Sequence, residues 1–119
     1  MTLRCLLVDD KDAVLEAATV LLRREGATVV GVASSTAEAL RQARALRPDV
    51  ALVDVGLGEV SGFDLARLLA QDGQGSADVI MISARAESDY SELIAESPVA
   101  GFLAKSELSA AGIHRILGR

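Results

Sequence analysis

The chain has 119 residues, enough for one domain with its own core, and half of them are hydrophobic. Its net charge of −5 argues against direct binding to nucleic acid, because phosphate recognition needs a basic surface. The single cysteine, Cys5, excludes a disulfide within the chain, and no apolar run approaches the roughly 18 residues that span a bilayer. We therefore expect one cytoplasmic domain over residues 1–119, with no membrane partner.

Short strand patterns and helical patterns alternate from the start of the chain. A strand is expected over residues 3–8, followed by apolar residues at helical spacing as far as Gly26, a C-terminal stop signal. A second strand over 28–32 precedes Ser35-Thr36-Ala37-Glu38, a capping box that predicts a helix through about Leu46.

The middle of the chain continues this alternation. The third strand, over 50–53, leads into a glycine-rich loop, Gly56-Leu57-Gly58-Glu59-Val60. A third helix opens at Ser61, and the polar, glycine-rich stretch 72–76 closes it. The fourth strand is expected over 78–82.

The last part of the chain completes five strand–helix units. A polar, weak helix is expected around 89–96, a fifth strand over 101–104 and a short helix over roughly 108–117. Five such units with short connections predict an α/β fold with a parallel sheet that helices cover on both faces. The nearly continuous apolar strands agree with a sheet that is buried on both sides.

Polar residues with reactive groups stand where four of these strands end. They are Asp9, Asp10, Asp54, Ser83 and Lys105. Because ligands of open α/β sheets bind beyond the carboxyl ends of the strands, we expect these side chains to form one site.

The residue types at these strand ends suit phosphoryl transfer with a divalent cation. Carboxylates and the backbone carbonyl of Gly56 offer oxygen ligands for Mg²⁺, and a carboxylate such as Asp54 beside the ion can act as a nucleophile toward phosphorus. Lys105 would supply a cation and Ser83 a hydroxyl donor for the oxygens of the transferred group.

These motifs together resemble the receiver domains of two-component response regulators over essentially the whole chain. The resemblance rests on Val8-Asp9-Asp10, Asp54, Ser83-Ala84 and the segment from Gly101 to Lys105. It implies a flavodoxin-like (βα)₅ three-layer sandwich, with a five-stranded parallel sheet in the order 2-1-3-4-5. The implied site roles are a phosphoacceptor, Asp54; a Mg²⁺ site of Asp9, Asp10, Asp54 and the Gly56 carbonyl; a phosphate partner, Lys105; a switch hydroxyl, Ser83; and a switch aromatic, Phe102.

The implied function is a signalling switch and not an enzyme acting on a separate substrate. A sensor histidine kinase or a phosphotransfer protein would phosphorylate Asp54 in the presence of Mg²⁺, and self-catalysed hydrolysis would reverse the change. The face made by the fourth helix, fifth strand and fifth helix would then control a protein partner. We expect a bacterial, stand-alone receiver that is a monomer or a weak, phosphorylation-dependent dimer, without direct nucleic-acid binding.

Two alternatives stay open at this point. The first is the regulatory half of a DNA-binding transcription factor, and the second is a phosphatase that acts on small molecules through Asp54. A phosphatase of that kind usually needs a second acid two residues past the nucleophile, where this chain has Gly56. Tyr90 is expected to be a packed helix residue, and His114 is given no role.

Overall fold

Five strands form one parallel sheet in this computed structural model, which describes residues 2–58, 60–71 and 77–118. The strands are β1 (Arg4–Val8), β2 (Thr28–Ala33), β3 (Val50–Asp54), β6 (Asp78–Ser83) and β7 (Gly101–Ala104). Their spatial order is β2-β1-β3-β6-β7, and all four neighbouring pairs are parallel. Counted along this sheet, the order is 2-1-3-4-5, so the predicted α/β flavodoxin-like fold is confirmed.

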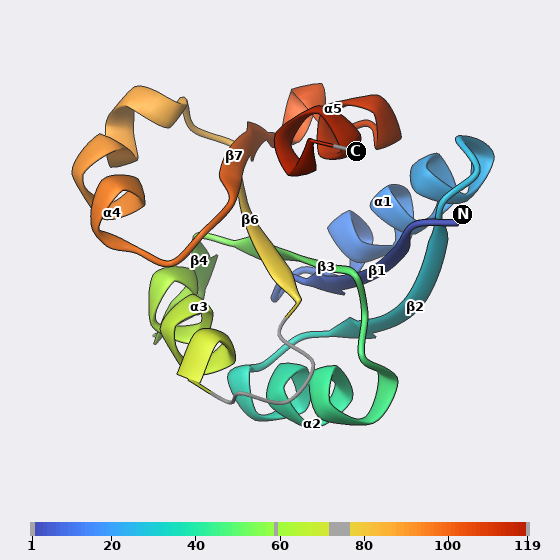
Figure 1. The fold of residues 1–119 in the computed structure, drawn as a ribbon, viewed down its shortest axis with the longest axis horizontal. Helices are drawn as coiled ribbons and strands as arrows, with labels where there is room; N and C mark the ends of the chain where they lie inside the picture. Colours follow the sequence, from blue (N-terminus) through green and yellow to red (C-terminus); the bar gives the residue numbers. More distant parts are fainter. Residues whose placement is uncertain (1, 59, 72–76, 119) are drawn as a thin grey trace.

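Helices cover both faces of the sheet (Figure 1). They are α1 (Asp12–Arg24), α2 (Thr36–Leu46), α3 (Gly62–Gln71), α4 (Ser91–Glu96) and α5 (Ala110–Leu117). Residues of α1 and α5 share one core cluster, and residues of α2 and α3 share the other, against which α4 packs through Ile94. The structure therefore has three layers, with the sheet in the middle.

The alternation of strand side chains builds these two cores. In β1, Leu6 and Val8 face the α2–α3 core, whereas Cys5 and Leu7 face the α1–α5 core. All four side chains are at most 2% exposed. A strand that is buried on both faces has no position for a polar residue until it ends, which explains why polar residues appear at the strand ends.

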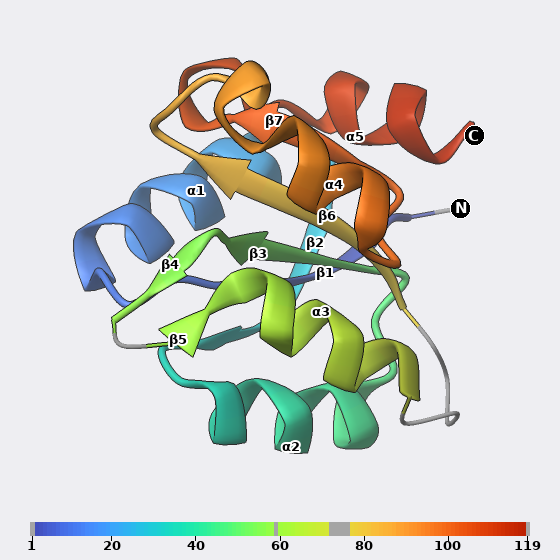
Figure 2. The ribbon, with the colours of Figure 1, turned by 90° about the vertical axis from the view of Figure 1, so that its left-hand side faces the viewer.

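The segment after Asp54 differs from the expected glycine-rich loop. It contains two short antiparallel strands, β4 (Gly56–Leu57) and β5 (Val60–Ser61), which lie beyond the end of β3 (Figure 2). Gly58 has a φ of +69°, a conformation that glycine adopts without strain, and this allows the chain to reverse between the two strands. The loop prediction was wrong for the paired residues, and its Glu59 lies outside the described residues.

Two helix boundaries also differ from the predictions. The last helix begins at Ala110 and not near Leu108, because the Ser109 hydroxyl accepts a hydrogen bond from Gly112 N at 2.9 Å and caps the helix there. The weak helix near 89–96 is a 3₁₀ turn, η1 (Glu87–Tyr90), followed by α4. The predicted helix closure at 72–76 falls outside the described residues.

None of the helices in the described part of the chain is long and apolar enough to cross a membrane.

Candidate functional site

The five polar residues predicted at the strand ends lie at one edge of the sheet. Asp54 and Ser83 are the last residues of β3 and β6, and the other three follow β1 and β7 directly. Asp9, Asp54 and Ser83 are 1%, 7% and 5% exposed, and among the described residues they are the buried polar ones. Burying polar groups is costly unless they are paired, so this edge is where the fold departs from an apolar core.

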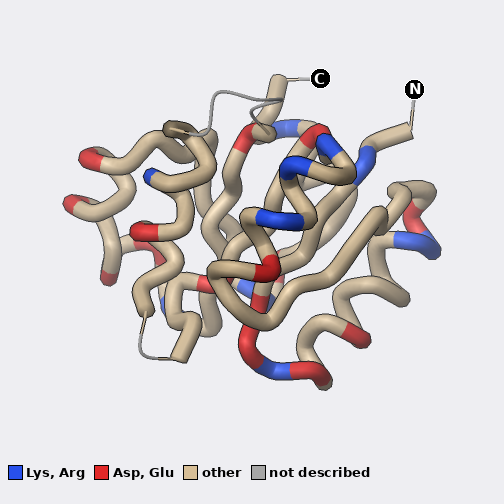
Figure 3. The backbone as a smooth tube through the Cα atoms, turned by 90° about the horizontal axis from the view of Figure 1, so that it is seen from below, with Lys and Arg blue, Asp and Glu red and all other residues tan. Residues whose placement is uncertain are grey.

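Three carboxylates and one ammonium group meet at this edge. Carboxylate oxygens of Asp9, Asp10 and Asp54 all lie within 4.8 Å of one another. Lys105 Nζ lies 2.8 Å from Asp9 Oδ2 and 3.3 Å from Asp54 Oδ1. In Figure 3, red acidic segments lie close together at the lower edge of the backbone tube, with a blue basic segment between them. The single ammonium therefore leaves this cluster with an excess of negative charge.

Burial and the excess of negative charge both shift the pKa values of Asp54 and Lys105. Burial of the Asp54 carboxyl and the nearby Asp9 carboxylate raise the pKa of Asp54 above 3.8, and Lys105 only partly opposes them. Burial alone would lower the pKa of the Lys105 ammonium, but its contacts with Asp9 and Asp54 outweigh that effect and raise it. Lys105 is therefore held charged, while the ionised form of Asp54 is disfavoured.

The donor set fits a small hard cation. Asp9, Asp10 and Asp54 offer carboxylate oxygens only, which Mg²⁺ prefers to nitrogen or sulfur ligands. Asp10 is exposed, so water can reach the cluster from that side, and Mg²⁺ usually keeps several waters. A divalent cation would also relieve the excess negative charge. Gly56, predicted to add a carbonyl ligand, lies two residues past Asp54 in the exposed part of β4, and that role stays a prediction.

Gly62 positions the Asp54 backbone, and sequence reasoning missed this function. Its N–H donates to Val55 O at 2.7 Å, which brings the start of α3 against the end of β3. A Cβ atom at residue 62 would overlap the backbone carbonyl oxygen of Asp54. Only glycine fits this close approach. The only signal in the sequence was a glycine at the start of a helix, and such glycines are too common to indicate a close backbone contact.

We expect Gly62→Ala to destabilise the protein by about 1–3 kcal/mol, because the added methyl group must displace the Asp54 backbone. Urea unfolding followed by circular dichroism measures the change. Gly56→Ala is the matched control, since nothing lies within 4 Å of a Cβ at that position. If the two variants were equally stable, the close approach at Gly62 would have no energetic importance.

The two predicted switch residues occupy defined positions. Ser83 Oγ accepts a hydrogen bond from Arg85 N at 3.0 Å and donates to Tyr90 Oη at 3.4 Å. Phe102 lies in β7 with only 8% of its surface exposed, and its ring contacts that of Tyr90. Phe102 is therefore already packed inward in this structure. Neither contact of Tyr90 was predicted.

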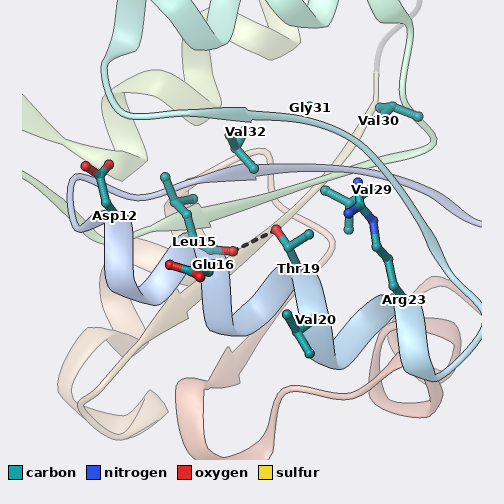
Figure 4. A pocket seen from close by; sticks show the side chains of 10 residues that line it. All are labelled: Asp12, Leu15, Glu16, Thr19, Val20, Arg23, Val29, Val30, Gly31 and Val32. Atoms are coloured by element: carbon teal, nitrogen blue, oxygen red, sulfur yellow. Dashed lines mark hydrogen bonds between the residues drawn. The ribbon is translucent and has the colours of Figure 1, made fainter.

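A second hollow in the surface is separate from this site. It is a groove of about 540 Å³ between α1 and β2, lined by four valines, a leucine, a glycine and four polar or charged residues (Figure 4). Thr19, one of the four polar or charged residues that line it, donates its hydroxyl to Leu15 O at 2.7 Å within α1. None of the predicted site residues lines this groove, so the groove is not part of the candidate phosphoryl-transfer site.

The fold and the acidic strand-end site define the class of the protein. A flavodoxin-like sheet carries three carboxylates where its central strands β1 and β3 end, and a lysine directly after the edge strand β7. The chain belongs to the response regulator receiver domains of two-component signalling, because the model of that family matches residues 5–116.

Named relatives agree with this assignment. The chain is 33% identical to the response regulator GacA of Pseudomonas viridiflava over 104 residues, which are 87% of this chain and 48% of GacA. It is 34% identical to the DNA-binding response regulator MtrA of Mycobacterium tuberculosis strain H37Rv over 88 residues, 74% of this chain and 37% of MtrA. A solved two-component response regulator of the LuxR family from Aurantimonas sp. SI85-9A1 superposes with a TM-score of 0.84 at 28% identity, covering 100% of this chain and 88% of that one. The chain spans about half or less of the length of these curated relatives.

Proposed function

We propose that this receiver domain is a phosphorylation-dependent switch in which Asp54 accepts a phosphoryl group. The observation that carries the proposal is the buried Asp54 carboxylate, 3.3 Å from the Lys105 ammonium and beside the carboxylates of Asp9 and Asp10. A nucleophilic carboxylate that is flanked by a cation and by ligands for a second cation suits phosphoryl transfer. Family membership supports the same chemistry.

In the proposed reaction, an Asp54 carboxylate oxygen attacks the phosphorus of a phosphohistidine on a sensor kinase or a phosphotransfer protein. The new O–P bond forms as the P–N bond breaks, and the electron pair of that bond leaves with the imidazole nitrogen. The Lys105 ammonium, 3.3 Å from Asp54 Oδ1, would offset the negative charge of the incoming phosphoryl oxygens. Mg²⁺, held by Asp9, Asp10 and Asp54, would neutralise further charge on the transferred group. Water then hydrolyses the acyl phosphate and resets the switch.

The output is a change in the shape of the α4–β7–α5 face. Ser83, at the end of β6, would donate its hydroxyl to the phosphoryl group on Asp54, at the end of the neighbouring β3. The helix α4 has six residues and no buried side chain, as expected for an element of low local stability that a small event can move. We propose that this face controls a protein partner in the cytoplasm.

A second form of the function is regulation of a DNA-binding region outside these residues. MtrA is named a DNA-binding response regulator, and the match covers only 37% of its length. The net charge of −5 makes direct DNA binding by the receiver itself unfavourable. A phosphatase acting on small molecules is less well supported, because Gly56 stands two residues past Asp54 and has no acidic group to protonate a leaving group.

The proposal predicts one phosphoryl group on the wild-type protein after incubation with acetyl phosphate and Mg²⁺. Intact-mass spectrometry measures the adduct, which should disappear when EDTA is added or when Asp54 is replaced by asparagine. Asp64→Asn is the matched control, since Asp64 is an exposed aspartate that pairs with Arg67 on α3. If wild type gains no adduct from acetyl phosphate or from a phosphorylated histidine kinase, Asp54 is not a phosphoacceptor. An adduct that persists in Asp54→Asn would place the acceptor elsewhere.

A further inference from the structure

Tyr90 joins the other aromatic residues of this chain into one contact. It is the only tyrosine, it ends the η1 turn, and α4 follows it directly. Its ring centroid lies 6.2 Å from that of Phe63 on α3 and 6.0 Å from that of Phe102 in β7. Both distances lie within the range of favourable aromatic pairs. Because the chain has two phenylalanines and no tryptophan, Tyr90 contacts all the remaining aromatic rings.

The Tyr90 hydroxyl reaches the proposed switch residue. Ser83 Oγ donates a hydrogen bond to Tyr90 Oη at 3.4 Å, while it accepts one from Arg85 N. A serine hydroxyl has one proton, so it can donate to Tyr90 or to a phosphoryl oxygen on Asp54, but not to both. The bond is long, and therefore weak, which suits a contact that must break during switching.

We propose that Tyr90 is a positioning residue that holds the Ser83 hydroxyl in the unphosphorylated state. When this hydrogen bond breaks on phosphorylation, Tyr90 moves and α4 moves with it. The proposal rests on the function proposed above, in which Asp54 receives the phosphoryl group. When Ser83 turns toward that group, Tyr90 loses its partner. Tyr90 ends η1 directly before α4, and α4 has no buried residue, so this lost contact acts on an element that is only weakly anchored to the core.

The packing of Phe102 supports this role for Tyr90. Phe102 is 8% exposed, and its ring lies against Tyr90. A change in the position of either ring must be accommodated by the other, since protein interiors are densely packed. The switch role that the family resemblance implies for Phe102 alone is therefore shared by the rings of Phe102 and Tyr90. Of these two residues, only Tyr90 has a hydroxyl that can bond to Ser83.

Tyr90→Phe tests the proposal, because it keeps the ring contacts with Phe63 and Phe102 and removes only the hydroxyl. Beryllofluoride with Mg²⁺ serves as the probe, in place of a phosphoryl group on Asp54. We expect the variant to bind beryllofluoride about two- to fivefold more tightly than wild type, since the bond that opposes switching is absent. In the Ser83→Ala background, the same substitution should leave beryllofluoride affinity unchanged.

A second readout does not depend on the probe. In the metal-free protein, amide hydrogen exchange over Ser91–Glu96 should be faster in Tyr90→Phe than in wild type, and equal in the two Ser83→Ala proteins. Equal beryllofluoride affinity of wild type and Tyr90→Phe would overturn the role of Tyr90 while leaving phosphorylation of Asp54 intact. An effect of the same size in the Ser83→Ala background would make Tyr90 a packing residue only. Failure of wild type to bind beryllofluoride would instead reject both proposals together.

Discussion

Replacing Lys105 by methionine should destabilise the metal-free protein by about 2 kcal/mol at pH 7 and slow phosphoryl uptake at least about tenfold. The Lys105 ammonium lies 2.8 Å from Asp9 Oδ2 and 3.3 Å from Asp54 Oδ1, and both aspartates are buried. Removing the cation leaves two buried carboxylates without their counter-charge. The loss is smaller than for a fully buried pair, because Lys105 is itself 20% exposed. Urea unfolding in EDTA and uptake from acetyl phosphate measure the two effects.

Lys11→Met is the control for that experiment. Lys11 is the only other lysine of the chain; it is exposed and stands two residues from Asp9. Its side chain can be shortened without removing the bond from its backbone N–H to Asp9 Oδ1 at 2.9 Å. We expect this variant to change stability by less than about 0.5 kcal/mol. If both methionine variants lost the same stability, the loss would come from removing one positive charge from the protein, and the specific ion pairs of Lys105 would contribute nothing further.

The strands could be predicted from the sequence because the central ones, such as β3 and β6, are buried on both faces. Their spatial order was implied only by the family resemblance. Continuous apolar runs such as Ala51–Val53 are unusual outside a covered parallel sheet, and the helical patterns between them require crossovers. The strand ends were less accurate. β3 and β6 continue through Asp54 and Ser83, because backbone pairing does not stop where the side chains become polar.

The convergence of the charged site residues was predictable for the same topological reason. Asp9 and Lys105 follow strands that end at one edge, and Asp54 is the last residue of another strand there; the structure brings their charged groups into contact. Their roles in phosphoryl transfer remain predictions that the experiments above test.

The contacts of Gly62 and Tyr90 could not be predicted from the sequence. A glycine at a helix start gives no indication that a carbonyl oxygen lies where its Cβ would be. The neighbours of a lone tyrosine in a polar segment depend on how η1 packs against α3 and β7, which no periodicity encodes. The hairpin after Asp54 was missed because each of its strands has only two residues. Short-range sequence patterns thus identify the charged residues of the site, whereas the contacts that position them, such as those of Gly62 and Tyr90, depend on tertiary packing.

Asp54→Asn should stabilise the metal-free protein by about 1–2 kcal/mol at pH 7, although it removes the proposed phosphoacceptor. Burial and the Asp9 carboxylate raise the pKa of Asp54 in the folded state above its ordinary value of 3.8. For a group whose pKa is raised on folding, the stabilising contribution is complete below the unfolded value and is lost as pH rises through the folded one. Wild type therefore loses stability as Asp54 ionises, whereas asparagine has no charge to bury.

The pH profile and the metal response distinguish this cause from a general effect of the substitution. The stability advantage of Asp54→Asn should shrink as pH falls toward the ordinary value of 3.8, because the raised pKa favours the protonated form of Asp54 in folded wild type there. Thermal unfolding in EDTA measures this change. Mg²⁺ should stabilise wild type more than the variant, because the ion relieves the repulsion among Asp9, Asp10 and Asp54. Asp64→Asn, at an exposed ion pair with Arg67, should change stability by less than about 1 kcal/mol and show neither response. If Asp54→Asn were instead less stable than wild type at pH 7 without metal, the attraction of Lys105 would outweigh the burial of Asp54, and the site would not be destabilised before its cation binds.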